Sequence, residues 1–188
     1  MNIFQRTTAL GVGVIAALAL TGCGSGDEVK TAAVPEGWSE LRTKGVDVAY
    51  PPAFKVQSDA ERSKYNAAAA TLTEGSRTVG TITVQLNFTT ARSAEQAAIA
   101  AEAGVQLGSK VEGTKKVDIA GTDDARRIDF EFAASGDKGQ PVQGAKVHGT
   151  IVTGLDSKDK TFAIRIDAQQ GKLADADLAK IIESIEVH

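Results

Sequence analysis

Apolar and polar residues alternate along four short stretches of the chain. The stretches are Val46–Tyr50, Ile82–Phe88, Ile128–Phe132 and Phe162–Ile166. Because successive side chains of a strand point to opposite faces, this pattern predicts four β-strands, each with one buried face and one polar face. Strands that keep one face in water are typical of an antiparallel sheet.

Turn-forming residues separate these strands. Three short runs, Glu74–Ser76, Gly121–Asp124 and Leu155–Asp159, are rich in the Gly, Asp and Ser that turns favour. We expect each run to close a hairpin. The longer segment Ala133–Gly144 is too polar and too rich in glycine for a helix or a strand. We therefore expect it to form a mobile hairpin loop.

Two other stretches change to a helical period. In the first, Ser93 and Gln96 form a capping box ahead of an alanine-rich run, and Gly104 and Gly108 offer two alternative ends. In the second, apolar residues stand at positions i, i+3, i+4 and i+7, namely Leu178, Ile181, Ile182 and Ile185. We expect both helices to be amphipathic and to lie on the sheet. The sequence thus predicts an α+β fold with an antiparallel sheet sandwiched by helices, in one domain over residues 36–188.

The N-terminal segment has a different pattern. The apolar stretch Ala9–Leu20 carries no charge and follows a short head with one positive side chain, Arg6. As a helix these 12 residues rise about 18 Å, which is less than the roughly 30 Å of a bilayer's hydrocarbon core. We therefore interpret residues 1–22 as a secretory signal peptide rather than a transmembrane helix.

The chain's only cysteine follows this stretch, in the sequence Leu20-Thr21-Gly22-Cys23. These four residues resemble the lipobox of bacterial lipoproteins. The resemblance implies cleavage between Gly22 and Cys23 and a diacylglyceryl group on the Cys23 thiol, with acylation of the new amino terminus as a further step. A buried structural cysteine and an intermolecular disulfide are the alternatives.

Residues 23–35 have no apolar period, and we expect them to be a flexible tether. With a lipid on Cys23, this tether would hold the protein on the outer face of the cell membrane.

Four segments of the predicted domain resemble the PsbP-like domains and LpqN-type lipoproteins of actinobacteria. The segments are GVDVAYPPAF (residues 45–54), TITVQLNF (81–88), AGTDDARRIDF (120–130) and LAKIIESIEV (178–187). The resemblance covers about residues 36–187 and implies an antiparallel sheet sandwiched by helices. It also implies a binding or accessory role at membranes, and it supplies no catalytic residue.

Charge and histidine content exclude several classes of function. The chain has 24 acidic and 21 basic residues, and the basic ones are scattered rather than clustered, so we expect no nucleic-acid partner. The two histidines, His148 and His188, are too few for a histidine metal cluster. A Ser-His-Asp triad would rest on His148 alone, and we interpret this residue as a solvated strand side chain.

Other candidate chemistry also has a structural interpretation. The glycine spacing of residues 75–81 imitates a phosphate-binding loop but lacks its lysine and precedes a strand, so we expect a hairpin turn. Three pairs of acids stand where turns and helix N-termini favour Asp: Asp123 with Asp124, Asp156 with Asp159, and Asp175 with Asp177. We predict no catalytic site, no metal site and no cofactor.

Four aromatic residues in the first third of the chain have two interpretations. Trp38, Tyr50, Phe54 and Tyr65 either line a ligand groove between sheet and helix or pack in the core, which a domain poor in aromatics requires. The favoured function is a noncatalytic surface lipoprotein that binds an envelope protein or assists assembly. The alternatives are a carrier or sensor of a small apolar or lipidic ligand and, third, a hydrolase of envelope polymers.

Overall fold

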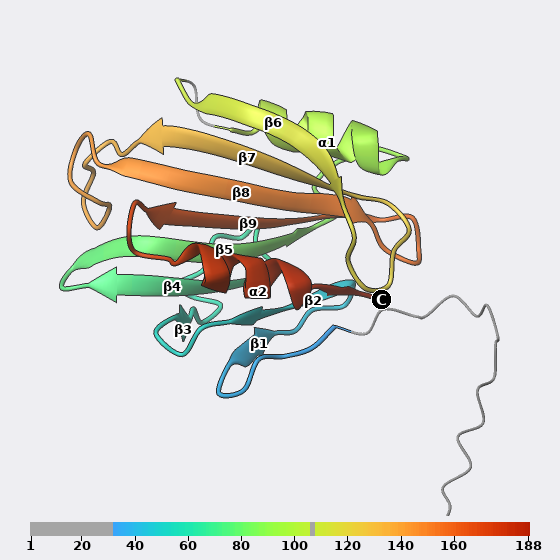
Figure 1. The fold of residues 1–188 in the computed structure, drawn as a ribbon, viewed down its shortest axis with the longest axis horizontal. Helices are drawn as coiled ribbons and strands as arrows, with labels where there is room; N and C mark the ends of the chain where they lie inside the picture. Colours follow the sequence, from blue (N-terminus) through green and yellow to red (C-terminus); the bar gives the residue numbers. More distant parts are fainter. Residues whose placement is uncertain (1–31, 106–107) are drawn as a thin grey trace, which may run out of the picture.

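A seven-stranded antiparallel sheet forms the centre of the computed structural model, which describes residues 32–105 and 108–188 (Figure 1). Its strand order is β3-β4-β5-β9-β8-β7-β6. The strands are β3 (Lys55–Val56), β4 (Ala68–Glu74), β5 (Arg77–Leu86), β6 (Lys110–Val117), β7 (Ala125–Ala133), β8 (Lys146–Leu155) and β9 (Thr161–Gln169). The predicted signal peptide, Cys23 and most of the predicted tether lie outside the described residues.

The two faces of this sheet are covered by different elements (Figure 1). Helix α1 (Ala94–Ala103) packs on one face, and helix α2 (Asp175–Glu183) packs on the other. A small sheet of β1 (Ser39–Leu41), β2 (Val46–Tyr50) and β10 (Glu186–Val187) shares the α2 side. This confirms the α+β prediction of an antiparallel sheet between helices, while the small sheet is an addition. Neither helix of the described ranges is long and apolar enough to cross a bilayer.

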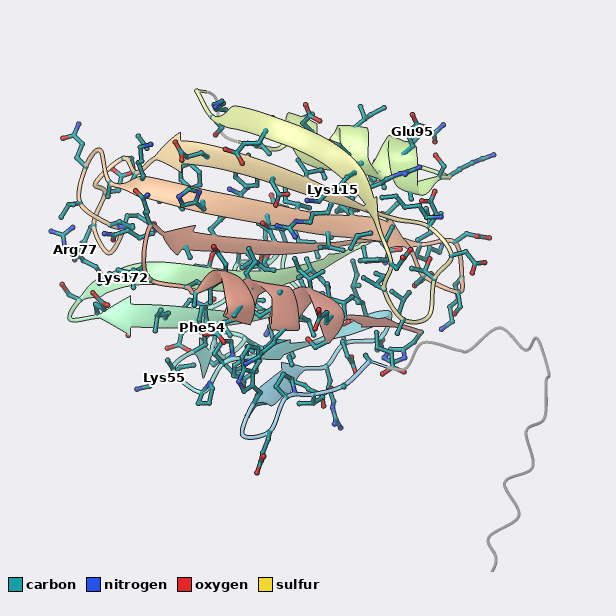
Figure 2. The ribbon with its side chains drawn as sticks, in the orientation of Figure 1. Phe54, Lys55, Arg77, Glu95, Lys115 and Lys172 are labelled. Atoms are coloured by element: carbon teal, nitrogen blue, oxygen red, sulfur yellow. The ribbon has the colours of Figure 1, made fainter. Side chains whose placement is uncertain are left out.

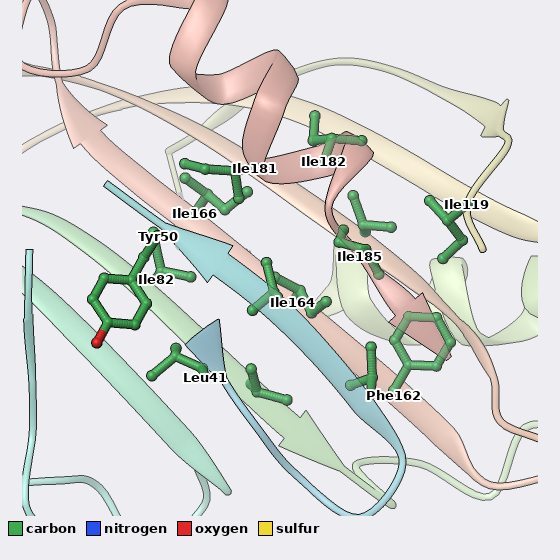
Figure 3. Packing of buried hydrophobic residues seen from close by; sticks show 14 of the residues in the cluster. Leu41, Tyr50, Ile82, Ile119, Phe162, Ile164, Ile166, Ile181, Ile182 and Ile185 are labelled. Carbon is green, nitrogen blue, oxygen red and sulfur yellow. The ribbon is translucent and has the colours of Figure 1, made fainter. Parts of the chain in front are cut away.

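The larger hydrophobic core lies between α2, β2 and the central strands (Figure 3). Its fully buried side chains include Ile82, Ile164, Ile166, Ile181 and Ile185. The hydroxyl of Ser184, just after α2, accepts a hydrogen bond from the Ala49 N–H at 2.9 Å and donates one to the Ile181 carbonyl at 2.7 Å. This buried hydroxyl therefore joins the end of α2 to the backbone of β2.

Helix α1 begins and ends close to the predicted positions. The Ser93 hydroxyl accepts a hydrogen bond from the Gln96 N–H at 3.2 Å, and Gly104 caps the other end. The Gln96 side chain bonds back to the N–H of Arg92, one residue before the predicted partner. The buried residues of α1 are all alanines, and Ile99 is 65% exposed. The expectation that α1 lies on the sheet with one face buried is confirmed, and that face consists of small side chains while Ile99 faces away from it.

Candidate binding site

A polar cavity lies on the α1 side of the sheet. Helix α1 packs over Ile128, Phe130, Ile151 and Ala163, and further along the same face the loop between β7 and β8 (residues 134–145) forms a roof. The space beneath it, which we call the loop cavity, has a volume of about 310 Å³. Its lining side chains include Thr81, Phe132, Gln140, Arg165, Asp167 and Gln169.

Hydrogen bonds hold the roof of the loop cavity in place. The Thr78 N–H donates to the Gly139 carbonyl at 2.8 Å, and the Arg77 Nη1 donates to the Gln140 carbonyl at 3.0 Å. Figure 2 shows Arg77 at the end of the β4–β5 hairpin, on the side of the molecule where this loop turns. Ala134 also exchanges backbone bonds with residues 144 and 145. The sequence predicts a mobile loop, whereas these contacts tie both its base and its tip.

An ion pair from β9 lies within the loop cavity. The Arg165 Nε donates to the Asp167 Oδ2 at 2.8 Å, and the Arg165 guanidinium lies 5.0 Å from the centre of the Phe130 ring. The Phe130 ring fills the space beside Gly149, where a Cβ atom would overlap its carbons. The two Nη groups of Arg165 make no hydrogen bond to any other described residue. Arg165 is therefore positioned by a salt bridge and an aromatic ring while its outer donors stay unused.

One oxygen of the Asp167 carboxylate has no hydrogen-bond donor. Its Oδ1 is buried and has no partner among the described residues. Burial raises the pKa of Asp167 above its ordinary value of 3.8, and the nearby Arg165 opposes that rise. A buried carboxylate oxygen without a donor costs free energy of folding, so this group calls for an explanation.

A second copy of the same sequence unit shows what Asp167 lacks. Arg-Ile-Asp occurs at residues 127–129 as well as 165–167. Asp129 faces the α2 side and receives hydrogen bonds at 2.8 Å from both Arg127 Nε and Thr150 Oγ1, with Lys115 Nζ at 3.4 Å. Each aspartate lies between a threonine and a glycine of the neighbouring strands: Thr150 and Gly113 flank Asp129, and Thr81 and Gly149 flank Asp167. Thr150 donates to Asp129, whereas in the described residues no hydrogen bond joins Thr81 to Asp167.

The raised pKa of Asp167 predicts how the melting temperature of the protein depends on pH. A folded-state pKa above the unfolded one means that the stability from protonated Asp167 is present below pH 3.8 and lost as the pH rises through the folded pKa. Asp167→Asn removes this titration, and its carboxamide oxygen can still accept from Arg165. We expect the melting temperature of the variant, relative to wild type, to rise between about pH 3 and about pH 7. Thermal unfolding across that range tests this, and a relative rise toward acid would contradict it.

A second cavity, the α2 cavity, lies on the opposite face. It has a volume of about 450 Å³ between the start of α2 and strands β8 and β9, with Ile166, Leu173 and Leu178 among its lining residues. His148 stands at its edge, half exposed as predicted, with Nδ1 3.7 Å from Glu131 Oε2. Lys146 donates to Glu131 at 3.1 Å and lowers the pKa of that carboxyl.

No catalytic triad forms around His148 in the described ranges. Thr150, two residues along the strand, donates its hydroxyl proton to Asp129 rather than to His148. No group of three His, Cys, Asp or Glu side chains in residues 32–105 and 108–188 could hold a metal ion.

The four aromatic residues do not come together in one groove. Tyr50 and Phe54 are buried in the larger core, Trp38 packs against its edge, and Tyr65 is 71% exposed. None of them lines the loop cavity or the α2 cavity. The groove interpretation therefore does not describe this structure, because the apolar core takes up three of the four rings.

Two of the three acidic pairs and the glycine run have structural positions, while the Asp124 Oδ1 of the third pair is buried without a partner among the described residues. The Asp156 carboxylate accepts hydrogen bonds from the backbone N–H groups of Lys158 and Lys160 in the β8–β9 turn. Asp175 and Asp177 lie in the first turn of α2. Gly75 closes the β4–β5 hairpin with a φ of 58°, a value that glycine adopts readily.

Comparison with known proteins shows similarity in fold alone. No family model and no curated protein sequence matches the chain. The chain is similar to the Ran-binding protein Mog1p of Saccharomyces cerevisiae, with 12% identity, a TM-score of 0.52, and coverage of 80% of this chain and 95% of that one. It is similar to LpqN of Mycobacterium tuberculosis, a protein involved in cell envelope biogenesis, with 12% identity, a TM-score of 0.50, and coverage of 80% and 90%.

A third similar structure is cyanobacterial PsbP from Synechocystis, with 9% identity, a TM-score of 0.45, and coverage of 88% and 99%. The match to LpqN supports the LpqN-like fold that the sequence resemblance implies.

Proposed function

We propose that the chain is a noncatalytic binding protein, anchored by a lipid on Cys23 to the outer face of the cell membrane. Its partner is an envelope protein, and the loop cavity is the surface that receives it. The observation that carries this proposal is the Arg165–Asp167 pair, which is buried in part, held on an aromatic ring and left with unused hydrogen-bonding groups.

The chemistry of the loop cavity suits binding rather than catalysis. Its guanidinium and carboxylate neutralise each other, and no histidine or cysteine lines it. A hydrolase would need a nucleophile and an adjacent base held in a pocket, whereas the Ser135 hydroxyl and the Asp137 carboxylate that it donates to are exposed on the roof loop. The fold also agrees with such a role, since Mog1p is a Ran-binding protein and LpqN takes part in cell envelope biogenesis.

A carrier of a small apolar or lipidic ligand is the second candidate. The α2 cavity favours it, because Ile166, Ala168, Leu173 and Leu178 provide apolar contacts there. Mass spectrometry of lipids extracted from the purified full-length protein tests this candidate. A one-to-one lipid would place the carrier function first.

Site-specific photo-crosslinking in cells tests the proposed function. Val142, 52% exposed on the roof loop, is replaced by the photoreactive amino acid p-benzoylphenylalanine in the full-length protein. We expect one discrete crosslinked protein band from this position. The matched control places the same group at Tyr65, which is 71% exposed and does not line the loop cavity, and should give no such band. Equal crosslinking from both positions, or none from Val142, would contradict the proposal.

A further inference from the structure

Arg165 brings two unpaired donor groups to the loop cavity, which it lines. Its Nε donates to the Asp167 Oδ2, while Nη1 and Nη2 make no hydrogen bond to any described residue. The buried side-chain polar atoms without a partner in the described ranges are Ser109 Oγ, Asp124 Oδ1 and Asp167 Oδ1. Neither Nη atom is among them, so both are in contact with solvent.

The position of the Arg165 side chain is fixed before any ligand binds. Asp167 holds its Nε at 2.8 Å, and its guanidinium carbon lies 5.0 Å from the centre of the Phe130 ring. That ring is 1% exposed and fills the space beside Gly149. A ligand that uses the Nη groups therefore does not have to order a mobile arginine, which is a large part of the usual cost of binding to this side chain.

The free edge of the Arg165 guanidinium has the geometry of a carboxylate receptor. Nη1 and Nη2 direct two parallel N–H donors at the spacing of the two oxygens of a carboxylate. A neutral carbonyl has one oxygen and satisfies this edge only in part. The buried Oδ1 of Asp167 cannot serve a ligand in the cavity. The unpaired groups that this ion pair offers to the cavity are therefore donors alone, and they call for an acceptor group.

The charges around the loop cavity leave room for one acidic group. Asp167 neutralises Arg165 only from the Nε side. Three cations and two carboxylates line the cavity or stand on its roof: Arg77, Lys138 and Arg165, with Asp137 and Asp167. One incoming carboxylate makes the two signs equal, whereas an incoming cation would add to the excess positive charge.

The size of the loop cavity selects a side chain. Its volume of about 310 Å³ is roughly ten times the share of one water molecule in the liquid. The roof is bonded to β5 at Thr78 and Arg77, so the entering group has to protrude from its own main chain. The carboxylates of Asp and Glu stand on one or two methylene groups, whereas a C-terminal carboxylate lies on the main chain itself.

We propose that the loop cavity receives an acidic side chain, Asp or Glu, of the partner protein, with its carboxylate accepting hydrogen bonds from Nη1 and Nη2 of Arg165. This inference rests on the proposed function and gives the recognition chemistry of the same site. Thr81, Gln140 and Gln169 of the lining supply neutral donors for the remaining lone pairs of the carboxylate. Asp167 is a positioning residue, because it holds Arg165 and does not touch the ligand.

Nuclear magnetic resonance on the full-length protein in detergent micelles, at constant ionic strength, tests this proposal. The probe is acetyl-glutamate amide, whose one charge is a side-chain carboxylate. Acetyl-glutamine amide is the neutral comparison, and acetyl-alanine carries a main-chain carboxylate instead. We expect the glutamate probe to shift the Arg165 Nε–H signal in a saturable way, and to bind more tightly than both comparisons. Equal binding of the glutamine probe would overturn the carboxylate, and equal binding of acetyl-alanine would overturn the side chain.

Matched variants of the two Arg-Ile-Asp units sharpen the test. Arg165→Lys keeps the charge but loses the paired Nη donors, and should weaken the glutamate probe by about tenfold. Arg127→Lys makes the same change in β7, outside the lining of the loop cavity, and should leave the affinity within about twofold. Equal losses in the two variants would contradict the proposal. The comparison of the three probes on the wild-type protein decides the question even if Arg165→Lys does not fold.

Asp167→Asn separates a positioning role from a purely structural one. The variant keeps a carbonyl oxygen that can accept from Arg165 Nε, and it removes a negative charge close to the bound carboxylate. We expect the glutamate probe to bind about threefold more tightly or better. A loss of binding in a variant with a native amide spectrum would contradict the proposal, because it would place Asp167 in contact with the ligand.

The proposed function can be tested separately. If the Val142 crosslink forms and the glutamate probe does not bind, the carboxylate inference fails and the proposed function stands. If the probe binds through Arg165 and no crosslink forms, the proposed function fails and the preference of the loop cavity for an acidic side chain stands.

Discussion

Ile182→Asp is expected to destabilise the folded protein by at least about 3 kcal/mol, because it places an unpaired carboxylate in the core. Ile182 is 4% exposed at the end of α2, and its neighbour Ile181 is fully buried (Figure 3). The charge would lie among side chains of β2 and the central strands that offer no cation. For a protein of this length, such a loss lowers the melting temperature by about 6 °C or more.

Ala179→Asp is the matched control for this experiment. It introduces the same side chain into the same helix, on its exposed side. The expected cost is below about 1 kcal/mol, mainly from the lower helix propensity of Asp. Circular dichroism during thermal unfolding compares both variants with wild type. An Ile182→Asp protein that melts at the wild-type temperature would show that α2 is not docked on the sheet in solution.

The parts of the fold that the sequence predicts are those with strong contrast between buried and exposed positions. Helix α2 is an example, since its isoleucines at helical spacing all face the core. Strand β9 is another, because Phe162, Ile164 and Ile166 are buried while Arg165 and Asp167 are on the opposite face. In both elements one face is buried and the other is in water, so apolar residues recur along the sequence with the period of the helix or the strand.

The elements that the sequence analysis missed lack this contrast. Strand β6 has eight residues, and seven of them are exposed, because it is the edge strand of the sheet. The Lys115 side chain of β6, labelled in Figure 2, is 63% exposed. Strand β10 has two residues and pairs with β2, about 140 positions earlier in the chain. Pairing at that separation leaves no local pattern.

The loop cavity could not be predicted for a related reason. Along β9, Arg165 and Asp167 have the alternation of an ordinary polar strand face, and the identical Arg-Ile-Asp unit of β7 has a complete set of donors. Each aspartate lies between a threonine and a glycine of the neighbouring strands, and the difference is that Thr150 donates its hydroxyl to Asp129 while Thr81 makes no such bond to Asp167. This is a property of strand register across separate parts of the chain. The repeated Arg-Ile-Asp unit was the only local signal.

Cys23→Ala is expected to abolish membrane anchoring. Cys23 lies outside the described residues, and this prediction rests on the Leu20-Thr21-Gly22-Cys23 resemblance. Two acyl chains would bury about thirty methylenes at ~0.8 kcal/mol each, an upper limit near 24 kcal/mol, whereas one chain binds membranes only reversibly. The alanine variant has no sulfur to carry the diacylglyceryl group.

Phase partitioning in detergent with mass spectrometry measures this effect. Wild-type protein should enter the detergent phase with an acylated N-terminus at Cys23. The Cys23→Ala protein should accumulate as a longer precursor that retains residues 1–22, because lipoprotein processing waits for the lipid. Ser25→Ala, two residues beyond the cysteine, is the control and should behave as wild type. A wild-type protein with a free thiol, or with a first residue other than Cys23, would contradict the lipobox interpretation. The anchored part of the proposed function would then fall, while the crosslinking test at Val142 would still apply to the binding part.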